Sequence, residues 1–409
     1  MPNVYVARQP ICDRNLHVVG YELLFRGGEA AATAGVTVAD DDAATSTVLL
    51  TAFAEIGLDR LVGDRKAYVN VSRRFLVEGY ASAVPPDRVV LEILEDAEVD
   101  AELEAVVRRM TGAGYHFALD DFVSRPSLDP LIGIVGIVKV EVLGLAPQEL
   151  ERQVRELAPR GVQLLAEKVE TYEEFERCKE LGFELFQGFF FCKPKTFSRR
   201  SVGPSRLATL GLVADLHAPE AQIANLEQVI AHDVGLSYKL LRYINSAFFA
   251  LPRTVGSLRQ ALVLLGLTNI RRWATLLALS GEDEQPDELI VCALVRARLC
   301  ELVARAYGDH DPEAFFTTGM FSAIDALMDA PLPVVLEELP LDAEIKAALL
   351  DFTGRKGEVL RSVLAYERGE LDVVHHRSLA GVRVGDLYVD AVEWATDVTV
   401  ELRPLAVVA

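Results

Sequence analysis

Short apolar runs alternate with stretches of helical spacing throughout the first half of the chain. Eight of these runs predict strands, at residues 4–7, 17–26, 67–71, 88–95, 116–122, 134–141, 162–167 and 185–191. Between them, apolar positions at helical spacing predict helices at residues 40–56, 75–80, 101–111, 147–157 and 172–181. Because the strands are almost continuously apolar and alternate with helices, they indicate a parallel sheet covered on both faces. About eight strands in roughly 195 residues favour a closed α/β barrel of the TIM type over an open sheet.

The second half of the chain carries helical spacing almost throughout. Helices are predicted at residues 207–216, 223–232, 237–244, 257–265, 269–279, 287–307 and 314–328, which indicates an all-α domain. A polar, basic connector with proline and glycine lies between the halves. We therefore expect a barrel domain at residues 1–195, a linker at 196–204 and a helical domain at 205–409, as a chain of 409 residues is too long for one ordinary core.

The amino-acid composition of the chain argues against two classes of protein, membrane proteins and general nucleic-acid binders. No apolar run approaches the roughly 18 residues that a membrane span needs, and the N-terminus lacks a targeting pattern, so we expect a cytoplasmic protein without a membrane partner. The net charge of −20 argues against a general nucleic-acid binder, although the local pair Arg271 and Arg272 leaves a small basic patch open. The five cysteines show no paired metal-ligand spacing and are expected to be reduced thiols.

Polar residues interrupt the apolar pattern near the end of successive predicted strands. They are Glu22, Asn70, Glu92, Asp120, Asp121, Lys139, Glu167 and Gln187. Any one of them could cap a helix, as Asp commonly does. Because the carboxyl ends of barrel strands meet at one face, their recurrence favours a shared site instead. Acids and amides around one lysine have the composition of an oxygen-ligand site for Mg²⁺ or Mn²⁺.

The same residues lie in motifs that resemble those of the EAL-domain family of cyclic-di-GMP phosphodiesterases, over about residues 1–195. In chain order the motifs are Tyr21-Glu22-Leu23-Leu24-Phe25-Arg26, Tyr-Val-Asn70-Val-Ser, Glu92-Ile-Leu-Glu95, Asp120-Asp121-Phe122-Val123, Lys139-Val-Glu141, Ala166-Glu167-Lys168-Val169-Glu170 and Gln187-Gly188-Phe189. Seven matches in chain order make the resemblance specific. It implies hydrolysis of one phosphodiester bond in cyclic-di-GMP to give the linear dinucleotide.

The resemblance also implies a role for each residue. Two divalent cations, Mg²⁺ or Mn²⁺, would be held by Glu22, Asn70, Glu92, Asp120 and Asp121. Glu167 would act as general base or metal-site carboxylate, and Lys139 would orient the attacking water or stabilise the anion. Arg26 would clamp a ligand phosphate, Gln187 would complete the ligand shell, and Glu95 would support the loop that follows Asp121.

Three departures from the family pattern leave a second interpretation open. Leu94 replaces a threonine, Glu141 replaces an aspartate, and Val123 stands where active members have a glycine-containing loop. Valine cannot adopt the backbone angles that glycine allows. The alternative to an active phosphodiesterase is therefore a non-catalytic receptor or adaptor that acts through protein contacts. Family members pair through this loop, so a homodimer is also left open.

The helical half resembles the HDOD domain, a relative of the HD-type phosphohydrolases that lacks their catalytic residues. The resemblance lies in residues 226–247, residues 257–266 and Arg271-Arg272-Trp273. His232 and Asp233 stand where this family has an ordinary helix end, and His375 and His376 are better explained as a solvated or capping pair than as ligands. The resemblance implies a regulatory or interaction module whose protein partner the sequence does not disclose.

Overall fold

The computed structural model of the chain describes residues 4–27, 57–94, 97–122, 128–193, 204–217, 223–232, 234–245, 249, 255–279, 286–370 and 384–406. The chain divides into two compact units. Unit 1 contains residues 1–191 and 364–389, and unit 2 contains residues 192–363 and 390–409. The sequence placed residues 364–389 with the helical half, and the predicted domain boundaries stay a prediction. The predicted helix at residues 40–56, Glu95, Val123, Asp233, His375 and His376 lie outside the described residues.

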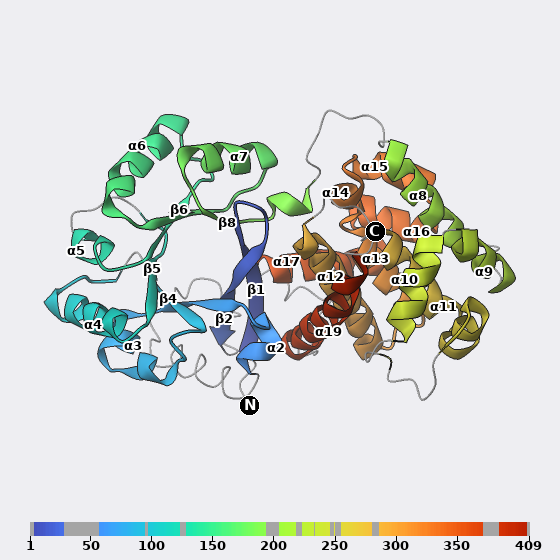
Figure 1. The fold of residues 1–409 in the computed structure, drawn as a ribbon, viewed down its shortest axis with the longest axis horizontal. Helices are drawn as coiled ribbons and strands as arrows, with labels where there is room; N and C mark the ends of the chain where they lie inside the picture. The colour runs from blue at the N-terminus through green and yellow to red at the C-terminus, as the bar shows by residue number, and fades with distance from the viewer. Residues whose placement is uncertain are drawn as a thin grey trace. The chain divides into compact units, whose positions relative to one another are not determined.

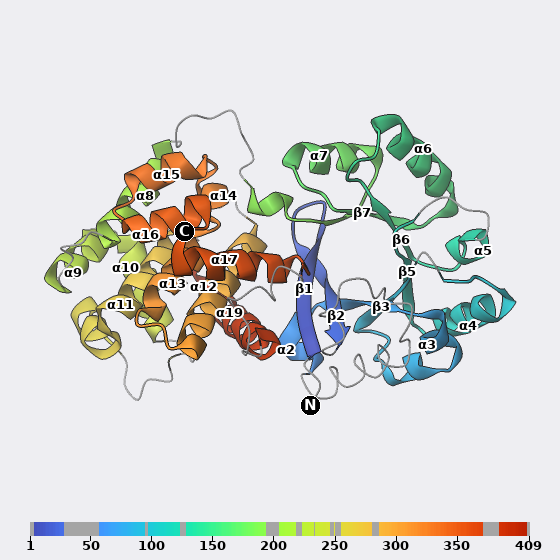
Figure 2. The same cartoon turned by 180° about the vertical axis from the view of Figure 1, so that it is seen from behind.

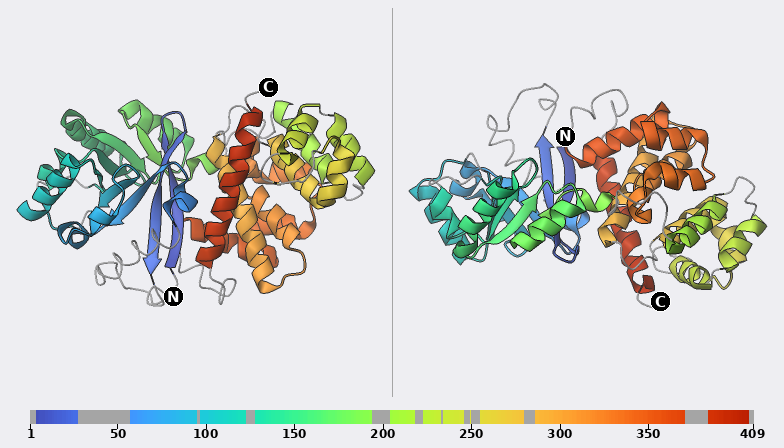
Figure 3. Two further views of the ribbon diagram at one scale, coloured as in Figure 1. Left: turned by 60° about the horizontal axis from the view of Figure 1, so that its bottom comes forward. Right: turned by 90° about the horizontal axis from the view of Figure 1, so that it is seen from above.

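Unit 1 is built on a closed barrel with the strand order β1 to β8. The strands are β1 (Val4–Asp13), β2 (Val18–Gly27), β3 (Lys66–Val71), β4 (Val89–Ile93), β5 (His116–Leu119), β6 (Ile137–Glu141), β7 (Gln163–Glu167) and β8 (Leu185–Gln187). The predicted barrel is thus confirmed. The prediction of an all-parallel sheet is wrong for one strand, because β1 runs antiparallel to both β2 and β8. Figure 3 shows β1 and β2 as a long hairpin.

Helices cover the outside of the barrel (Figure 1). They are α2 (Leu58–Val62), α3 (Arg73–Val77), α4 (Ala101–Gly112), α5 (Asp129–Ile132), α6 (Pro147–Leu157) and α7 (Tyr172–Leu181), with 3-10 turns η3 (Tyr80–Ala83), η5 (Ala158–Arg160) and η6 (Phe190–Cys192). Local sequence sets their starts. Thr171 and Glu174 form a reciprocal capping box at α7, and Asp100 caps α4 through the Leu103 amide. The short helices α2 and α5 were not predicted.

One layer of apolar side chains fills the barrel interior. It consists of Ile11, Tyr68, Val90, Ala118, Ile137, Leu165 and Leu185, all buried. β2 contributes Gly20 instead of a side chain, and a Cβ there would lie 2.6 Å from the Tyr68 ring. The missing side chain on β2 therefore makes room for the Tyr68 ring, which completes the layer.

Unit 2 contains helices and, among its described residues, no strand (Figure 2). Its helices are α8 (Pro204–Leu216), α9 (Ile223–His232), α10 (Val234–Ile244), α11 (Leu258–Leu279), α12 (Asp287–Tyr307), α13 (Pro312–Phe321), α14 (Ile324–Met328), α15 (Leu332–Glu338), α16 (Ala343–Asp351) and most of α17 (Gly354–Glu367) and α19 (Val384–Ala406). The predicted single helix at residues 314–328 is wrong. The Ser322 hydroxyl donates to the carbonyl of Gly319, and Ala323 has a non-helical φ of −115°, so the chain divides into α13 and α14 there.

Among the described residues, one segment, Leu258–Ala278 in α11, is long and apolar enough by composition to span a membrane. Core helices of soluble proteins meet the same criterion, and 44% of the segment's most apolar window is buried within the structure. Gly266 has φ 78° and ψ 163°, so α11 is two shorter helices joined at a kink. Neither part reaches the roughly 20 residues of a spanning helix. The cytoplasmic location stays a prediction.

Candidate metal centre

The polar residues predicted from the strand ends form a second layer inside the barrel, above the apolar one. Side chains alternate along a strand, so a residue two positions from a core residue points to the same interior. Asn70, Glu92, Asp120, Lys139, Glu167 and Gln187 each stand two positions after a core residue on β3 to β8, and Glu22 stands two positions after Gly20 on β2. The barrel therefore brings seven of the predicted side chains to one mouth.

The ammonium group of Lys139 lies at the centre of this layer. Its Nζ is 2.7 Å from Asp120 Oδ1, 2.8 Å from Glu92 Oε1 and 2.9 Å from Glu167 Oε1. Glu22 Oε2 lies 3.2 Å away. The Lys139 side chain is 0% exposed, and the four carboxylates are at most 10% exposed. One buried cation thus faces four buried acids, an arrangement that leaves negative charge in excess.

Two amides fix the carboxylate of Glu22 from the other side. Asn70 Nδ2 donates to Glu22 Oε1 at 3.0 Å, and Gln187 Nε2 donates to Glu22 Oε2 at 2.6 Å. Gln187 Nε2 also donates to Gln9 Oε1 at 3.0 Å. Since a carboxylate only accepts, both amides must direct their nitrogen toward Glu22, which leaves their oxygens for another partner.

Gln9 is a site residue that the sequence analysis missed. It faces Glu22 across the β1–β2 pair, two residues before the core residue Ile11. Because β1 runs against the other strands, its site residue comes before the core position instead of after it. The signal was present in Arg8-Gln9-Pro10, a polar pair inside an apolar run.

Burial and charge shift the pKa values of this cluster in different directions. Burial raises the pKa of Glu92 well above its ordinary value and raises that of Asp120, in both cases against the pull of Lys139. Burial also acts to raise the pKa of Glu22, but Lys139 and the donors Gln187 and Asn70 outweigh it, so the pKa is lowered. Burial acts to lower the pKa of Lys139, and the surrounding acids raise it instead. Lys139 therefore stays charged.

Glu167 also has a raised pKa. Burial raises its pKa to about 8, opposed by Lys139 and reinforced by the charges of Asp120 and Glu22. A carboxyl group with a pKa near the working pH can exchange a proton with a reacting group. The general-base role of Glu167 stays a prediction.

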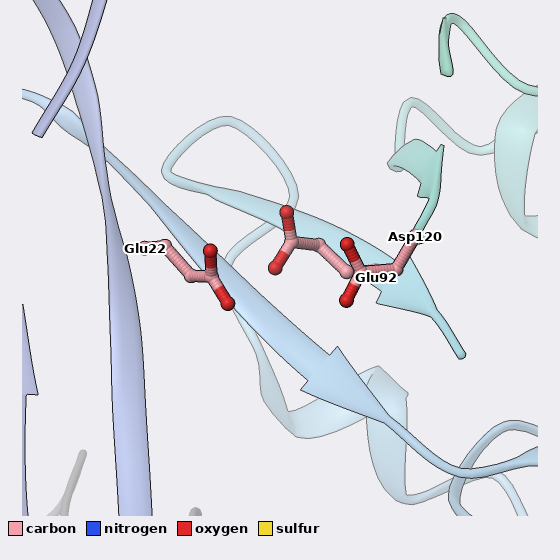
Figure 4. Close-up of side chains that lie close together, drawn as sticks. All are labelled: Glu22, Glu92 and Asp120. Atoms are coloured by element: carbon pink, nitrogen blue, oxygen red, sulfur yellow. The ribbon is translucent and has the colours of Figure 1, made fainter. Parts of the chain in front are cut away.

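The donor set fits a divalent cation. Ligand oxygens of Glu22, Glu92 and Asp120 all lie within 4.8 Å of one another, and Figure 4 shows the three carboxyl groups turned toward each other. Four further buried oxygens accept no hydrogen bond from any described residue: Asn70 Oδ1, Glu92 Oε2, Glu167 Oε2 and Gln187 Oε1. Buried acceptors without donors are costly unless a cation meets them. Clustered carboxylate and amide oxygens are the ligands that Mg²⁺ and Mn²⁺ prefer.

Asp121 lies in a different environment from Asp120. Its φ is +41°, in the left-handed region. Burial acts to lower the pKa of Lys168, but the hydrogen bond to Glu141 and the charge of Asp121 raise it. Lys168 also has a left-handed φ, of +54°, and its Nζ pairs with Glu141 Oε2 at 2.5 Å. Non-glycine residues in this region carry backbone strain, which is often found at functional sites. Glu141, which replaces the aspartate of the family pattern, therefore pairs with Lys168. This lysine also places a positive charge beside Asp121.

The structure does not describe the side chains of two predicted site residues. Arg26 lies on β2, but its side chain is outside the description, and Glu95 is outside it altogether. Their roles, like those of the other site residues, stay predictions.

Comparison with known domain families matches both halves of the chain. The model for the EAL domain matches residues 2–194, and the model for the HDOD domain matches residues 208–333. "Cyclic di-GMP phosphodiesterase CdgJ" of Vibrio cholerae is 33% identical over 407 residues, which cover 97% of this chain and 94% of that protein. "Uncharacterized protein YuxH" of Bacillus subtilis is 31% identical over 402 residues, which cover 96% of this chain and 98% of that protein.

Solved structures are similar to part of the chain. The Klebsiella pneumoniae BlrP1 calcium and cyclic-di-GMP complex is 23% identical over 46% of this chain and 54% of that chain, with a TM-score of 0.38. A standalone EAL protein of Vibrio cholerae in its cyclic-di-GMP-bound form is 25% identical over 49% of this chain and 96% of that chain, with a TM-score of 0.36. The match to BlrP1 thus spans about half the length of that protein.

Proposed function

Because this chain belongs to the family of EAL-domain proteins that also carry an HDOD domain, we propose that its barrel hydrolyses cyclic-di-GMP to the linear dinucleotide. Both resemblances drawn from the motifs are confirmed by the family matches. The observation that supports the proposal most is the buried layer of Glu22, Glu92 and Asp120, whose oxygens converge within 4.8 Å. A cyclic dinucleotide carries two phosphodiester anions, which a mouth lined by acids binds only with the help of cations.

We place two Mg²⁺ or Mn²⁺ ions at this mouth. Glu22, Glu92 and Asp120, whose oxygens lie within 4.8 Å of one another, would hold one ion together with Asn70, and Asp121 would contribute to the second. Bound divalent cations would neutralise charge on the phosphoryl oxygens and acidify a bound water. Asn70 and Gln187 hold the Glu22 carboxylate in one orientation through hydrogen bonds of 3.0 Å and 2.6 Å. The ligand set is therefore fixed before the ions arrive.

The remaining polar residues act on the reacting groups. In the hydrolysis, the oxygen of a water bonds to phosphorus and one phosphorus–ester oxygen bond breaks. One proton of that water would pass to the ionised carboxylate of Glu167, and the leaving oxygen would take up a proton from solvent. Lys139 stays charged and orients the attacking water or stabilises the phosphoryl anion. Arg26 would bind the second phosphate of the ligand.

A second candidate is a receptor that binds cyclic-di-GMP without hydrolysing it. The observation that favours it is the charge of Lys168 beside Asp121, because a cation there competes with the second metal ion. The substitution of the glycine loop by Val123 acts in the same direction. In this case the HDOD domain would pass the bound state to a protein partner.

For the helical half we propose a regulatory or interaction module without catalysis. Within the described residues, the acid and thiol groups that converge as metal ligands lie only in the barrel. We also propose a cytoplasmic location. A homodimer through the segment after Asp121 would fit the family pattern.

Calorimetric titration separates the two candidates. The full chain is titrated with cyclic-di-GMP in Ca²⁺, Mg²⁺ and Mn²⁺ separately, and parallel samples in Mg²⁺ or Mn²⁺ are followed for linear product. A phosphodiesterase binds in Ca²⁺ and forms product in Mg²⁺ or Mn²⁺. A receptor binds in all three ions and forms no product, and absence of binding in all three contradicts both candidates.

A further inference from the structure

The barrel has an incompletely paired edge on β1. This strand pairs with β2 from Val4 to Cys12, but it pairs with β8 only from Ile11 to Asp13. The edge from Val4 to Pro10 that faces away from β2 therefore has backbone groups without a strand neighbour in β8. Such an edge must be covered or bonded by other parts of the chain.

Two tyrosines from the far end of the chain supply bonds along this edge. The Tyr366 hydroxyl donates to the carbonyl of Val6 at 2.9 Å, and the amide of Arg8 donates to the Tyr388 hydroxyl at 3.3 Å. Residues two apart on a strand direct their backbone groups to the same edge, so the two hydroxyls take the places that a neighbouring strand would fill. The two rings lie 5.0 Å apart and are buried, at 0% and 2% exposure.

The face of β1 that points out of the barrel also makes contacts, through Arg8. Arg8 Nη1 donates to the carbonyl of Leu61 at 2.5 Å, and the Arg8 guanidinium lies 4.1 Å from the centre of the Tyr21 ring. Tyr21 directly precedes Glu22 on β2. Contacts outside the barrel thus fix the two strands that carry Gln9 and Glu22 inside it.

We propose that Tyr366 and Tyr388, which we name the edge clamp, position the Glu22 carboxylate through β1. This rests on the proposed function, because it concerns the same site. Gln9 lies on the opposite face of β1 from Arg8 and accepts from the Gln187 amide that binds Glu22. If β1 loses its edge bonds, Gln9 shifts and the orientation of Gln187 toward Glu22 is no longer fixed. Tyr366 and Tyr388 then belong functionally to the barrel, although they follow the HDOD match in the chain.

The two tyrosines of the edge clamp also lie close to residues 364 and 389, the positions at which the chain enters and leaves unit 1. Tyr366 is in α17 and Tyr388 is in α19, and residues 354–363 of α17 and 390–406 of α19 belong to unit 2. The edge clamp is thus formed by the ends of two helices, and these ends belong to unit 1.

The test removes only the two hydroxyl groups in the full chain. Tyr366→Phe, Tyr388→Phe and the double variant are compared with Tyr238→Phe, which removes a hydroxyl from a tyrosine that is 54% exposed on α10. Amide hydrogen exchange is measured for peptides that cover β1 and β8, and the dissociation constant for Mn²⁺ is measured by calorimetry. We expect exchange in β1 to be about 2- to 10-fold faster in each single variant. We also expect faster exchange in β8 and weaker Mn²⁺ binding in the double variant, with no change in Tyr238→Phe.

Unchanged exchange in β1 and β8 of the double variant would overturn the proposal. So would faster exchange together with unchanged Mn²⁺ affinity, since the tyrosines would then serve stability alone. If the wild-type chain binds no Mn²⁺, the proposed function fails, and the exchange of β8 still decides whether the clamp acts on Gln187. The two failures are thus distinguishable.

Discussion

Lys139 Nζ and Glu92 Oε1 lie 2.8 Å apart, and both side chains are 0% exposed. A buried ion pair of this kind is stable only because further groups share the charge, here the carboxylates of Glu22, Asp120 and Glu167. The ammonium group holds the acids together at the position where cations are proposed to bind. Lys139 therefore contributes to the stability of the metal-free barrel and lies in the site proposed for hydrolysis.

Replacement of Lys139 by methionine keeps the length of the side chain and removes the charge. We expect the metal-free protein to lose about 3–5 kcal/mol of unfolding free energy, because four buried acids lose their cation. Turnover of cyclic-di-GMP should fall by about 10²-fold or more. Lys179→Met, on the outer surface of α7, is the matched control. Wild-type stability of Lys139→Met in a chelator, measured by chemical unfolding, would contradict the central place given to this residue.

The pKa of Glu167 predicts how stability depends on pH. A folded-state pKa of about 8 against an ordinary value of 4.5 means that the folded state holds its proton more tightly. The stabilisation is fully present below pH 4.5 and is lost as the pH rises through 8. In the metal-free protein, we expect Glu167→Gln to remove part of the stability loss between pH 5 and 9. Unfolding in a chelator across this range is the measurement, with Glu180→Gln on α7 as control, and parallel curves would refute the assignment.

Gln9 gives a test of the orientation of Glu22. Gln9→Met keeps the volume and removes the oxygen that accepts from Gln187. We expect Mn²⁺ affinity to weaken about 10-fold, as for other residues that orient a metal ligand. Gln163→Met, at the opposite end of β7 from Glu167, should leave the affinity unchanged. Equal affinities in the two variants, measured by calorimetry, would show that Gln9 has no orienting role.

Lys168 gives a test of the second metal position. Lys168→Gly relieves a left-handed φ of +54° and removes the positive charge beside Asp121. We expect tighter or additional Mn²⁺ binding, with an unfolding free energy within about 1 kcal/mol of wild type, because the exposed pair with Glu141 contributes little. Glu141→Gln is the control, since it breaks the same ion pair and keeps the lysine. Unchanged Mn²⁺ stoichiometry and affinity in Lys168→Gly would count against competition at this position.

The barrel and most of its mouth could be predicted because both follow from local pattern. A side-chain period of two places Asn70 above Tyr68 and Glu92 above Val90, and parallel strands then bring such residues together. The carboxyl ends of parallel strands meet at one face of the barrel, but β1 is antiparallel to its neighbours and brings its amino-terminal part to that face. Gln9 was missed for this reason. The predicted first strand also ended at residue 7, directly before the polar pair Arg8 and Gln9.

Contacts between distant segments could not be predicted from the sequence. Tyr366 and Val6 are 360 residues apart, and nothing in the pattern around either one indicates the other. The break between α13 and α14 depends on a serine that caps the preceding turn, although the apolar spacing continues through it. Local periodicity reports which face of an element is buried, but it does not report which segment covers that face.

The most direct measurement is a comparison of product formation by wild type and Glu22→Ala. The full chain is incubated with cyclic-di-GMP and Mg²⁺ or Mn²⁺, and the linear dinucleotide is quantified by chromatography, with Glu180→Ala as the matched surface control. The proposed mechanism predicts linear product from wild type and Glu180→Ala, a loss of about 10²-fold or more in Glu22→Ala, and none in a chelator. Wild-type product no greater than that of Glu22→Ala would contradict the proposal that this barrel is a phosphodiesterase.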